Sequence, residues 1–367
     1  MMKIFSFPHV VIYKLMEQFE PVALISLSLC STRAHALVKT FSRTSEELTV
    51  EHAPCHDGYS LSFPGRNLIT VATNQTKLLN TTRLQTRHGL NFCFDRRSRR
   101  MRRMFTCCAD AIQGCRETTN YICDLFKIPL STVVIFRETD LWLLDFAQRR
   151  QEQRLRNVYT SHFESSADSY SRVMRVQSRS MGIRQSRLED SGAIGSTYSS
   201  GPTEISPILC NATDILDCGM WPPDNYRFDG KLPSAKILTI IHGYWLTREQ
   251  VLRLESPKAK IGYAHIWSPG INALLRCWLA GEGLGNLKYL KFSKATYDDA
   301  IYEGIRDRLE RVQGEITYKC DEFKPEVRFT TNNAFHIRRD DGVVATVMYD
   351  DQCLVMAVWP DPDGNFY

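Results

Sequence analysis

Residues 5–41 hold three short apolar segments, and this feature constrains the fold more than any other. Val11, Leu15 and Phe19 follow one another at intervals of four, which places them on one face of a helix. Pro21 suits the first turn of a second helix, and a serine ten residues later can cap a third. Such small helices cannot bury all this apolar surface among themselves. Either the rest of the chain or a partner must cover it.

The order of these residues resembles an F-box, and more narrowly the F-box of the large nematode F-box families. The resemblance is carried by Phe-Pro at residues 7–8, Pro-Val-Ala-Leu at 21–24 and Leu-Ser-Leu-Cys-Ser at 27–31. F-boxes elsewhere begin with Leu-Pro, and the phenylalanine here keeps the apolar contact. An F-box implies docking on a Skp-type adaptor, and through it on a cullin. The residues expected to contact the adaptor are Phe7, Pro8, Val11, Leu15, Pro21, Leu24 and Leu27. The plain alternative is a helical hairpin at a domain edge.

The composition is that of an ordinary globular chain, with 43% hydrophobic and 24% charged residues in a length of 367. This length predicts two or three domains. No window approaches the ~18–20 apolar residues of a membrane-spanning helix. The net charge of +5 is small, so contact with nucleic acid would need a local basic cluster.

One such cluster exists at Arg96–Arg103, where six of eight residues are arginines. The simplest interpretation is a solvated loop leading into a helix. A nuclear import signal and a phosphate-binding segment are the alternatives, and the second would make the chain a nuclear nucleic-acid-binding protein. No aromatic residues interleave the run, which argues against recognition of single strands.

The twelve cysteines include no Cys-x-x-Cys pair. Structural zinc sites usually show two close ligand pairs, whereas the tightest cluster here, residues 107–123, shows one. We therefore expect reduced, metal-free thiols that pack as small hydrophobes, and no cofactor. Three Asn-x-Thr sequons and an apolar run near the N-terminus leave open a secreted, disulfide-bonded glycoprotein. Charged residues before that run argue against a secretion signal.

The middle of the chain predicts an intermediate α/β region over residues 42–148. Strand-like segments are expected at 47–51, 59–63, 68–72, 90–94 and 130–136, and a helix at 104–126. Residues 141–146 are expected to form either a second buried strand after 130–136 or a short turn. Residues 149–204 are rich in serine and arginine and have no sustained apolar period. We expect this stretch to be a disordered polar linker or an insertion.

The C-terminal region predicts alternating strands and helices. Strands are expected at 236–241, 260–266 and 287–292, and this spacing is that of a degenerate leucine-rich repeat. Thr247 and Gln250 fit a capping box, and Gly281 can close a helix that starts at Ser268. Asp-Asp-Gly before residue 343 predicts a hairpin, with a third strand at 354–359. The expected fold class is thus α+β: a short three-helix F-box, then an α/β strand–helix repeat region that ends in an antiparallel hairpin.

Residues 205–360 also resemble the type 2 F-box-associated domain. The resemblance is carried by Trp-Leu-Thr at 245–247, by 272–278 with the following glycine, by Leu-Lys-Tyr-Leu at 287–290, and by 337–346. Two resemblances in this order imply the substrate-recognition subunit of a Skp–cullin–F-box ubiquitin ligase, cytoplasmic or nuclear, with an unknown protein substrate and no catalytic residues. No HExxH, phosphate-binding loop or nucleophile elbow is present. Six aromatic residues are candidate anchors, although most are expected in the core: Tyr244, Trp245, Tyr263, Trp267, Tyr289 and Trp359.

Overall fold

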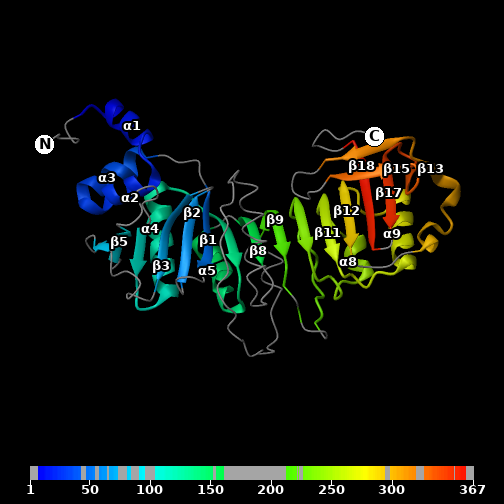
Figure 1. Cartoon of the computed structure of the whole chain (residues 1–367), viewed down its shortest axis with the longest axis horizontal. Coiled ribbons are helices and arrows are strands. Elements are labelled where there is room, and N and C mark those ends of the chain that lie inside the picture. The colour runs from blue at the N-terminus through cyan, green and yellow to red at the C-terminus, as the bar shows by residue number, and fades with distance from the viewer. Residues whose placement is uncertain are drawn as a thin grey trace. The chain divides into compact units, whose positions relative to one another are not determined.

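The structure is a computed structural model of the chain, and Figure 1 shows it with its elements labelled. It describes residues 7–42, 47–53, 58–63, 66–72, 81–83, 91–95, 104–151, 154–160, 212–220, 222, 226–293, 298–319, 326–350 and 352–360. The described part divides into two compact units, unit 1 up to Leu155 and unit 2 from Arg156 onward. The fold is α+β, and each unit is built around a mixed sheet.

Unit 1 begins with three helices, as the sequence predicts. They are α1 (His9–Glu17), α2 (Pro21–Cys30) and α3 (Thr32–Phe41), and together we name them the three-helix segment. Pro21 occupies the first turn of α2, where its missing N–H costs nothing. The Ser31 hydroxyl accepts a hydrogen bond of 3.0 Å from the Ala34 amide and so caps α3.

The rest of unit 1 is a seven-stranded sheet with two helices. Its strands are β1 (Leu48–Ala53), β2 (Gly58–Phe63), β3 (Arg66–Ala72), β4 (Thr81–Arg83), β5 (Asn91–Asp95), β6 (Met104–Cys107) and β7 (Leu130–Ile135). They lie in the order β7-β1-β2-β3-β6-β5-β4, with parallel pairing between β1 and β7 and between β3 and β6. The helices are α4 (Ala111–Phe126) and α5 (Trp142–Arg150), and a 3-10 turn covers Glu138–Asp140. The strands expected at 47–51, 59–63, 68–72, 90–94 and 130–136 are confirmed as β1, β2, β3, β5 and β7.

Two expectations for unit 1 need correction. The predicted helix at 104–126 is confirmed over α4, but residues 104–107 form the strand β6 instead, because they pair with β3 and Asp110 caps the helix after them. The segment 141–146, expected as a second strand or a short turn, lies almost wholly in α5. Its buried residues Leu143, Leu144 and Ala147 recur at the helical period, which the short window concealed.

Unit 2 is a mixed sheet in which four adjacent strands run parallel. Those strands are β9 (Ala212–Cys218), β10 (Ile237–Ile240), β11 (Lys258–Gly262) and β12 (Tyr289–Ser293). Helix α8 (Arg248–Leu252) connects β10 to β11, and α9 (Ser268–Ala280) connects β11 to β12. Figure 1 shows both helices beside these strands. The predicted alternation of strand and helix is therefore present.

The far side of the sheet in unit 2 is antiparallel. It comprises β18 (Cys353–Trp359), β17 (Val344–Asp350), β16 (Ala334–Arg338) and β13 (Leu309–Arg311), in that order outward from β12. A separate pair, β14 (Glu315–Tyr318) and β15 (Val327–Thr330), packs here, and its Tyr318 stacks on Tyr289. Two 3-10 turns, η5 (Asp299–Tyr302) and η6 (Arg306–Arg308), precede β13. The predicted hairpin and third strand are confirmed as β16, β17 and β18.

The segment 149–204 is only partly described. Residues 155–160 form a strand, β8 (Leu155–Thr160), at the β9 side of the unit 2 sheet, and α5 extends to Arg150. The disorder expected for most of 149–204 does not extend to this strand, because Leu155, Val158 and Tyr159 bury their side chains. The remainder from 161 lies outside the described residues, as do Arg96–Arg103 and the three sequon asparagines. In the described part of the chain, no helix is long and apolar enough to cross a membrane.

Candidate protein-binding surfaces

The seven residues predicted to contact an adaptor lie on α1, on α2 or directly before α1. They comprise two buried residues, Pro21 and Leu24, three half-buried residues, Phe7, Leu15 and Leu27, and two exposed residues, Pro8 and Val11. The chain itself covers the two buried side chains. The other five remain accessible.

An apolar stripe runs along α1. Val11 and Leu15 are spaced by four residues and so share one face of α1, while Phe7 lies just before the helix and Phe19 just after it. All four are at least partly exposed, with Val11 and Phe19 at 40% of their full accessible area. We name these four residues the helical stripe. Val10, at 73% exposed, extends its apolar surface.

The opposite side of α1 packs inward, and α2 is fastened to α4. Ile12 and Met16 are buried. In α2, the buried Ser28 hydroxyl lies 2.5 Å from the hydroxyl of Tyr121 in α4. The His35 ring of α3 also contacts the Tyr121 ring, with centroids 5.7 Å apart. The helical stripe is thus the part of the three-helix segment that unit 1 leaves uncovered among its described residues.

A second surface lies in unit 2 where β10 and β11 end. Carboxyl ends of neighbouring parallel strands meet at one edge of a sheet, which is where open α/β sheets bind ligands. The loop after β10 closely approaches the end of β11, since the Gly243 amide donates to the Gly262 carbonyl at 2.7 Å. Both positions need glycine: a Cβ on Gly243 would lie 2.6 Å from Ile261 Cγ2, and one on Gly262 would lie 2.5 Å from the Ile241 carbonyl oxygen.

Three aromatic side chains project from the loop after β11. Exposed and buried residues alternate here as in a strand, so Tyr263, His265 and Trp267 face outward while Ala264 and Ile266 are buried. Tyr263 is 46% and Trp267 67% exposed. We name the three outward residues the aromatic surface.

Histidine rings stack on both large rings of the aromatic surface. His265 lies parallel to Trp267, with 6.4 Å between centroids and 15° between planes. The buried His242, from the loop after β10, stacks on Tyr263 at 5.4 Å and 12°. The Tyr244 ring contacts His265 as well.

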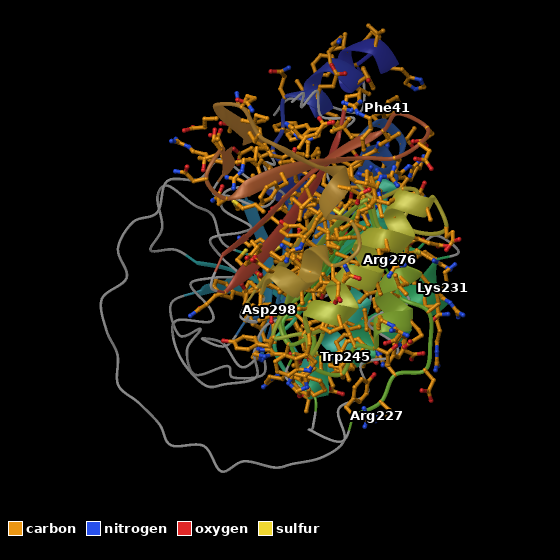
Figure 2. All side chains as sticks on the ribbon, turned by 90° about the vertical axis from the view of Figure 1, so that its right-hand side faces the viewer. Phe41, Arg227, Lys231, Trp245, Arg276 and Asp298 are labelled. Atoms are coloured by element: carbon orange, nitrogen blue, oxygen red, sulfur yellow. The ribbon has the colours of Figure 1, made fainter. Side chains whose placement is uncertain are left out.

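The loop after β10 is held by its own packing. Trp245 is buried, and the rings of Tyr226 and Phe228 meet it edge-on at 5.6 and 5.7 Å. Figure 2 shows Trp245 with Arg227 beside it toward the lower side of this unit. The aromatic surface therefore rests on a packed base.

Gln250 joins this packing to the start of α8. The side-chain oxygen of Gln250 accepts a hydrogen bond from the backbone amide of Thr247 at 3.0 Å. The backbone amide of Gln250 donates to the Thr247 hydroxyl at 3.2 Å, so the predicted capping box is confirmed. Its side-chain nitrogen donates to the carbonyls of Phe228 and Gly230. One side chain thus caps a helix and holds the segment before β10.

The six aromatic candidates from the sequence divide into core and surface. Trp245, Tyr289 and Trp359 are buried, Tyr244 is half-buried, and Tyr263 and Trp267 are exposed. The sequence reasoning missed His242 and His265. The alternation Tyr-Ala-His-Ile-Trp at 263–267 was the available signal, because it places three rings on one side.

Of the eight cysteine side chains that the structure describes, three are buried, four are half-buried and Cys30 is exposed. None of these eight forms a disulfide. Burial raises the pKa of the Cys123 thiol, and that of Cys218 to about 11, which keeps both protonated at neutral pH. Within the described ranges, no three His, Cys, Asp or Glu side chains converge as they would to hold a metal ion. The two surfaces are suited to binding.

Comparison of the chain with models of protein families, with curated proteins and with solved structures finds no match.

Proposed function

We propose that this chain is the substrate-recognition subunit of a Skp–cullin–F-box ubiquitin ligase. Its three-helix segment would bind a Skp-type adaptor as an F-box does, and the adaptor would link it to the cullin. The chain would supply no chemistry. It would hold a protein substrate close to the ubiquitin-conjugating enzyme, so that transfer becomes effectively intramolecular.

The observation that carries the proposal is the helical stripe. Four apolar side chains at four-residue spacing lie partly exposed, two on α1 and one beyond each of its ends, while α2 behind them is fastened to α4 by Ser28 and Tyr121. Exposed contiguous apolar surface of this kind marks interaction sites. Its position matches the resemblance of residues 7–31 to an F-box.

In the same proposal, unit 2 receives the substrate. Its parallel strands with intervening helices support a leucine-rich-repeat-like, F-box-associated domain, in which neighbouring repeats present side chains from a common edge. The aromatic surface lies at such an edge. An adaptor of this kind would work in the cytoplasm or nucleus, where the ligase and reduced cysteines are found together.

The experiment is co-precipitation of a Skp-type adaptor with the full chain. Val11→Asp combined with Phe19→Asp places two charges in the helical stripe without entering the core, since both side chains are 40% exposed. We expect adaptor recovery to fall at least about tenfold, because each lost apolar contact is worth about 1.5 kcal/mol or more. Ala36→Asp, an exposed position on α3, is the control and should bind normally. Full adaptor recovery by the folded double variant would refute the proposal.

A further inference from the structure

Two rings of the aromatic surface each keep one face open. His265 covers one face of Trp267, and His242 covers one face of Tyr263, yet these side chains remain 67% and 46% exposed. The backbone does not require a tyrosine here. Tyr263 has φ of 50°, in the left-handed region that glycine or asparagine adopts at lower cost. A bulky aromatic residue held there and left in solvent points to a binding role.

Exposed carboxylates adjoin the same surface. The Asp298 amide donates to the Ser268 hydroxyl at 3.1 Å, which places Asp298 beside the residue that follows Trp267. The Asn272 side-chain amide donates to the Glu303 carbonyl at 2.7 Å and so holds the backbone of this second acidic residue beside the second turn of α9.

The local charge is negative. Residues 298–308 carry four carboxylates and two arginines. Asp298 and Glu303 are exposed, as is Asp299, to which the Tyr349 hydroxyl donates. Arg308 is already engaged with the Asp340 carboxylate at 2.7 Å. An anionic ligand would therefore be repelled from this edge, whereas a cation would be attracted to it.

We propose that the aromatic surface binds a basic segment of a partner protein, with an arginine or lysine side chain over the open face of Trp267 or Tyr263 and a second cation near Asp298. Aromatic faces attract guanidinium and ammonium groups, and tryptophan does so most strongly. The flanking carboxylates supply the complementary charge. This inference names the substrate class for unit 2 and in that respect rests on the proposed function, although the binding itself can be measured without the adaptor.

The probe is a fluorescein-labelled twelve-residue peptide in which arginine and lysine alternate with glycine and serine. Its anisotropy is titrated with the full chain, in parallel with a peptide that has glutamate in place of every basic residue and with a neutral proline-rich peptide. We expect the basic peptide to bind at least tenfold more tightly than either of the others, and more weakly as salt rises.

Variants at the surface test the assignment of residues. Trp267→Ala should raise the Kd of the basic peptide by about 3- to 30-fold, which corresponds to the loss of a cation–π contact. Tyr263→Asn removes the second ring and suits the left-handed backbone, so loss of the fold is not expected. Asp298→Asn should weaken binding about two- to fivefold while keeping the cap of η5, since its side-chain oxygen accepts from the Ala300 amide.

Two controls match these changes. Thr40→Ala changes an exposed residue on α3 in unit 1, and Glu282→Gln removes an exposed carboxylate at the opposite end of α9. Both should leave the Kd for the basic peptide unchanged. Equal binding of the basic and acidic peptides, tighter binding of the proline-rich peptide, or an unchanged Kd in Trp267→Ala and Tyr263→Asn would overturn the inference.

Adaptor co-precipitation with the same variants separates this inference from the proposed function. Basic-peptide binding that depends on Trp267, in a chain that recruits no Skp-type adaptor, would support the surface and contradict the proposed function. An adaptor-binding chain that ignores the basic peptide would leave the proposed function in place and overturn this inference.

Discussion

The side-chain oxygens of Ser28 and Tyr121 lie 2.5 Å apart and join α2 to α4. Both residues are buried, and Ser28 also donates to the Ile25 carbonyl at 2.6 Å, which leaves Tyr121 as the donor between the two hydroxyls. The three-helix segment is therefore tied to the body of unit 1 by a specific polar contact as well as by apolar packing. A partner bound to the helical stripe would be held in a defined orientation relative to the sheet of unit 1.

Removing this contact should weaken the attachment of the three-helix segment. Tyr121→Phe keeps the ring and deletes the hydroxyl, so we expect a loss of about 1 kcal/mol in the free energy of unfolding. Urea denaturation followed by circular dichroism measures it. Tyr263→Phe, at an exposed site, should change stability by less than about 0.5 kcal/mol. Equal effects of the two substitutions would show that the contact adds nothing.

The close approach of the loop after β10 to the end of β11 predicts that Gly243 cannot be enlarged. In Gly243→Ala the new Cβ would lie 2.6 Å from Ile261 Cγ2, so we expect a loss of about 1–3 kcal/mol. Gly285→Ala is the matched control, because no atom lies within 4 Å of its Cβ position. Thermal unfolding of both variants compares them, and a Gly243→Ala protein as stable as the control would contradict the packing described.

The carboxyl group of Asp217 in β9 should make the free energy of unfolding depend on pH. Burial raises the pKa of Asp217 to about 6, against the opposing charge of Lys260. Unfolded aspartate titrates near pH 4, so between about pH 4 and 6 the folded state keeps a proton that the unfolded state has lost. This contribution to stability falls as pH rises through that window and is constant above it.

The substitution Asp217→Asn isolates that contribution. We compare the free energies of unfolding of the variant and the native chain. The difference, variant minus native, should increase by at most about 3 kcal/mol between pH 4 and 7 and then stay constant. Urea unfolding at half-unit pH intervals measures both proteins. A difference that stays constant across the range would show that Asp217 titrates normally.

Thiol reactivity should follow the position of each cysteine. Cys30 is exposed at the end of α2, whereas Cys115 is buried in α4 and burial raises its thiol pKa. A brief maleimide pulse on the native chain, read by peptide mass spectrometry, should label Cys30 and leave Cys115 largely unmodified. The sequence-based expectation of a metal-free protein is checked on the same sample, where metal analysis should find well below one zinc per chain.

The sequence predicted elements best where local chemistry decides them. Pro21 and Ser31 marked the starts of α2 and α3, and the Thr247–Gln250 capping box marked α8. The helix predicted at 104–126 was wrong only at residues 104–107, because pairing with β3 makes them a strand. Pairing with a distant strand produces no local periodic pattern in the sequence, so it could not be predicted there.

The candidate surfaces depended still more on tertiary structure. The period of four predicted the helical stripe, but nothing local indicated that Leu24 would be covered while Phe19 stayed exposed. Among the six aromatic candidates, two lie in strands and are buried, and the packing of the loops decides the exposure of the other four. The stacking of His242 on Tyr263 joins two loops, so no single stretch of sequence contains it.

The shared side chain of Gln250 has a consequence for local opening. The same amide group caps α8 and anchors the carbonyls of Phe228 and Gly230, so neither role can be lost without disturbing the other. Fluctuations that fray the first turn of α8 should also release the segment before β10. Amide protons in the two places would then exchange with solvent at matching rates, as one cooperative unit whose integrity depends on one glutamine.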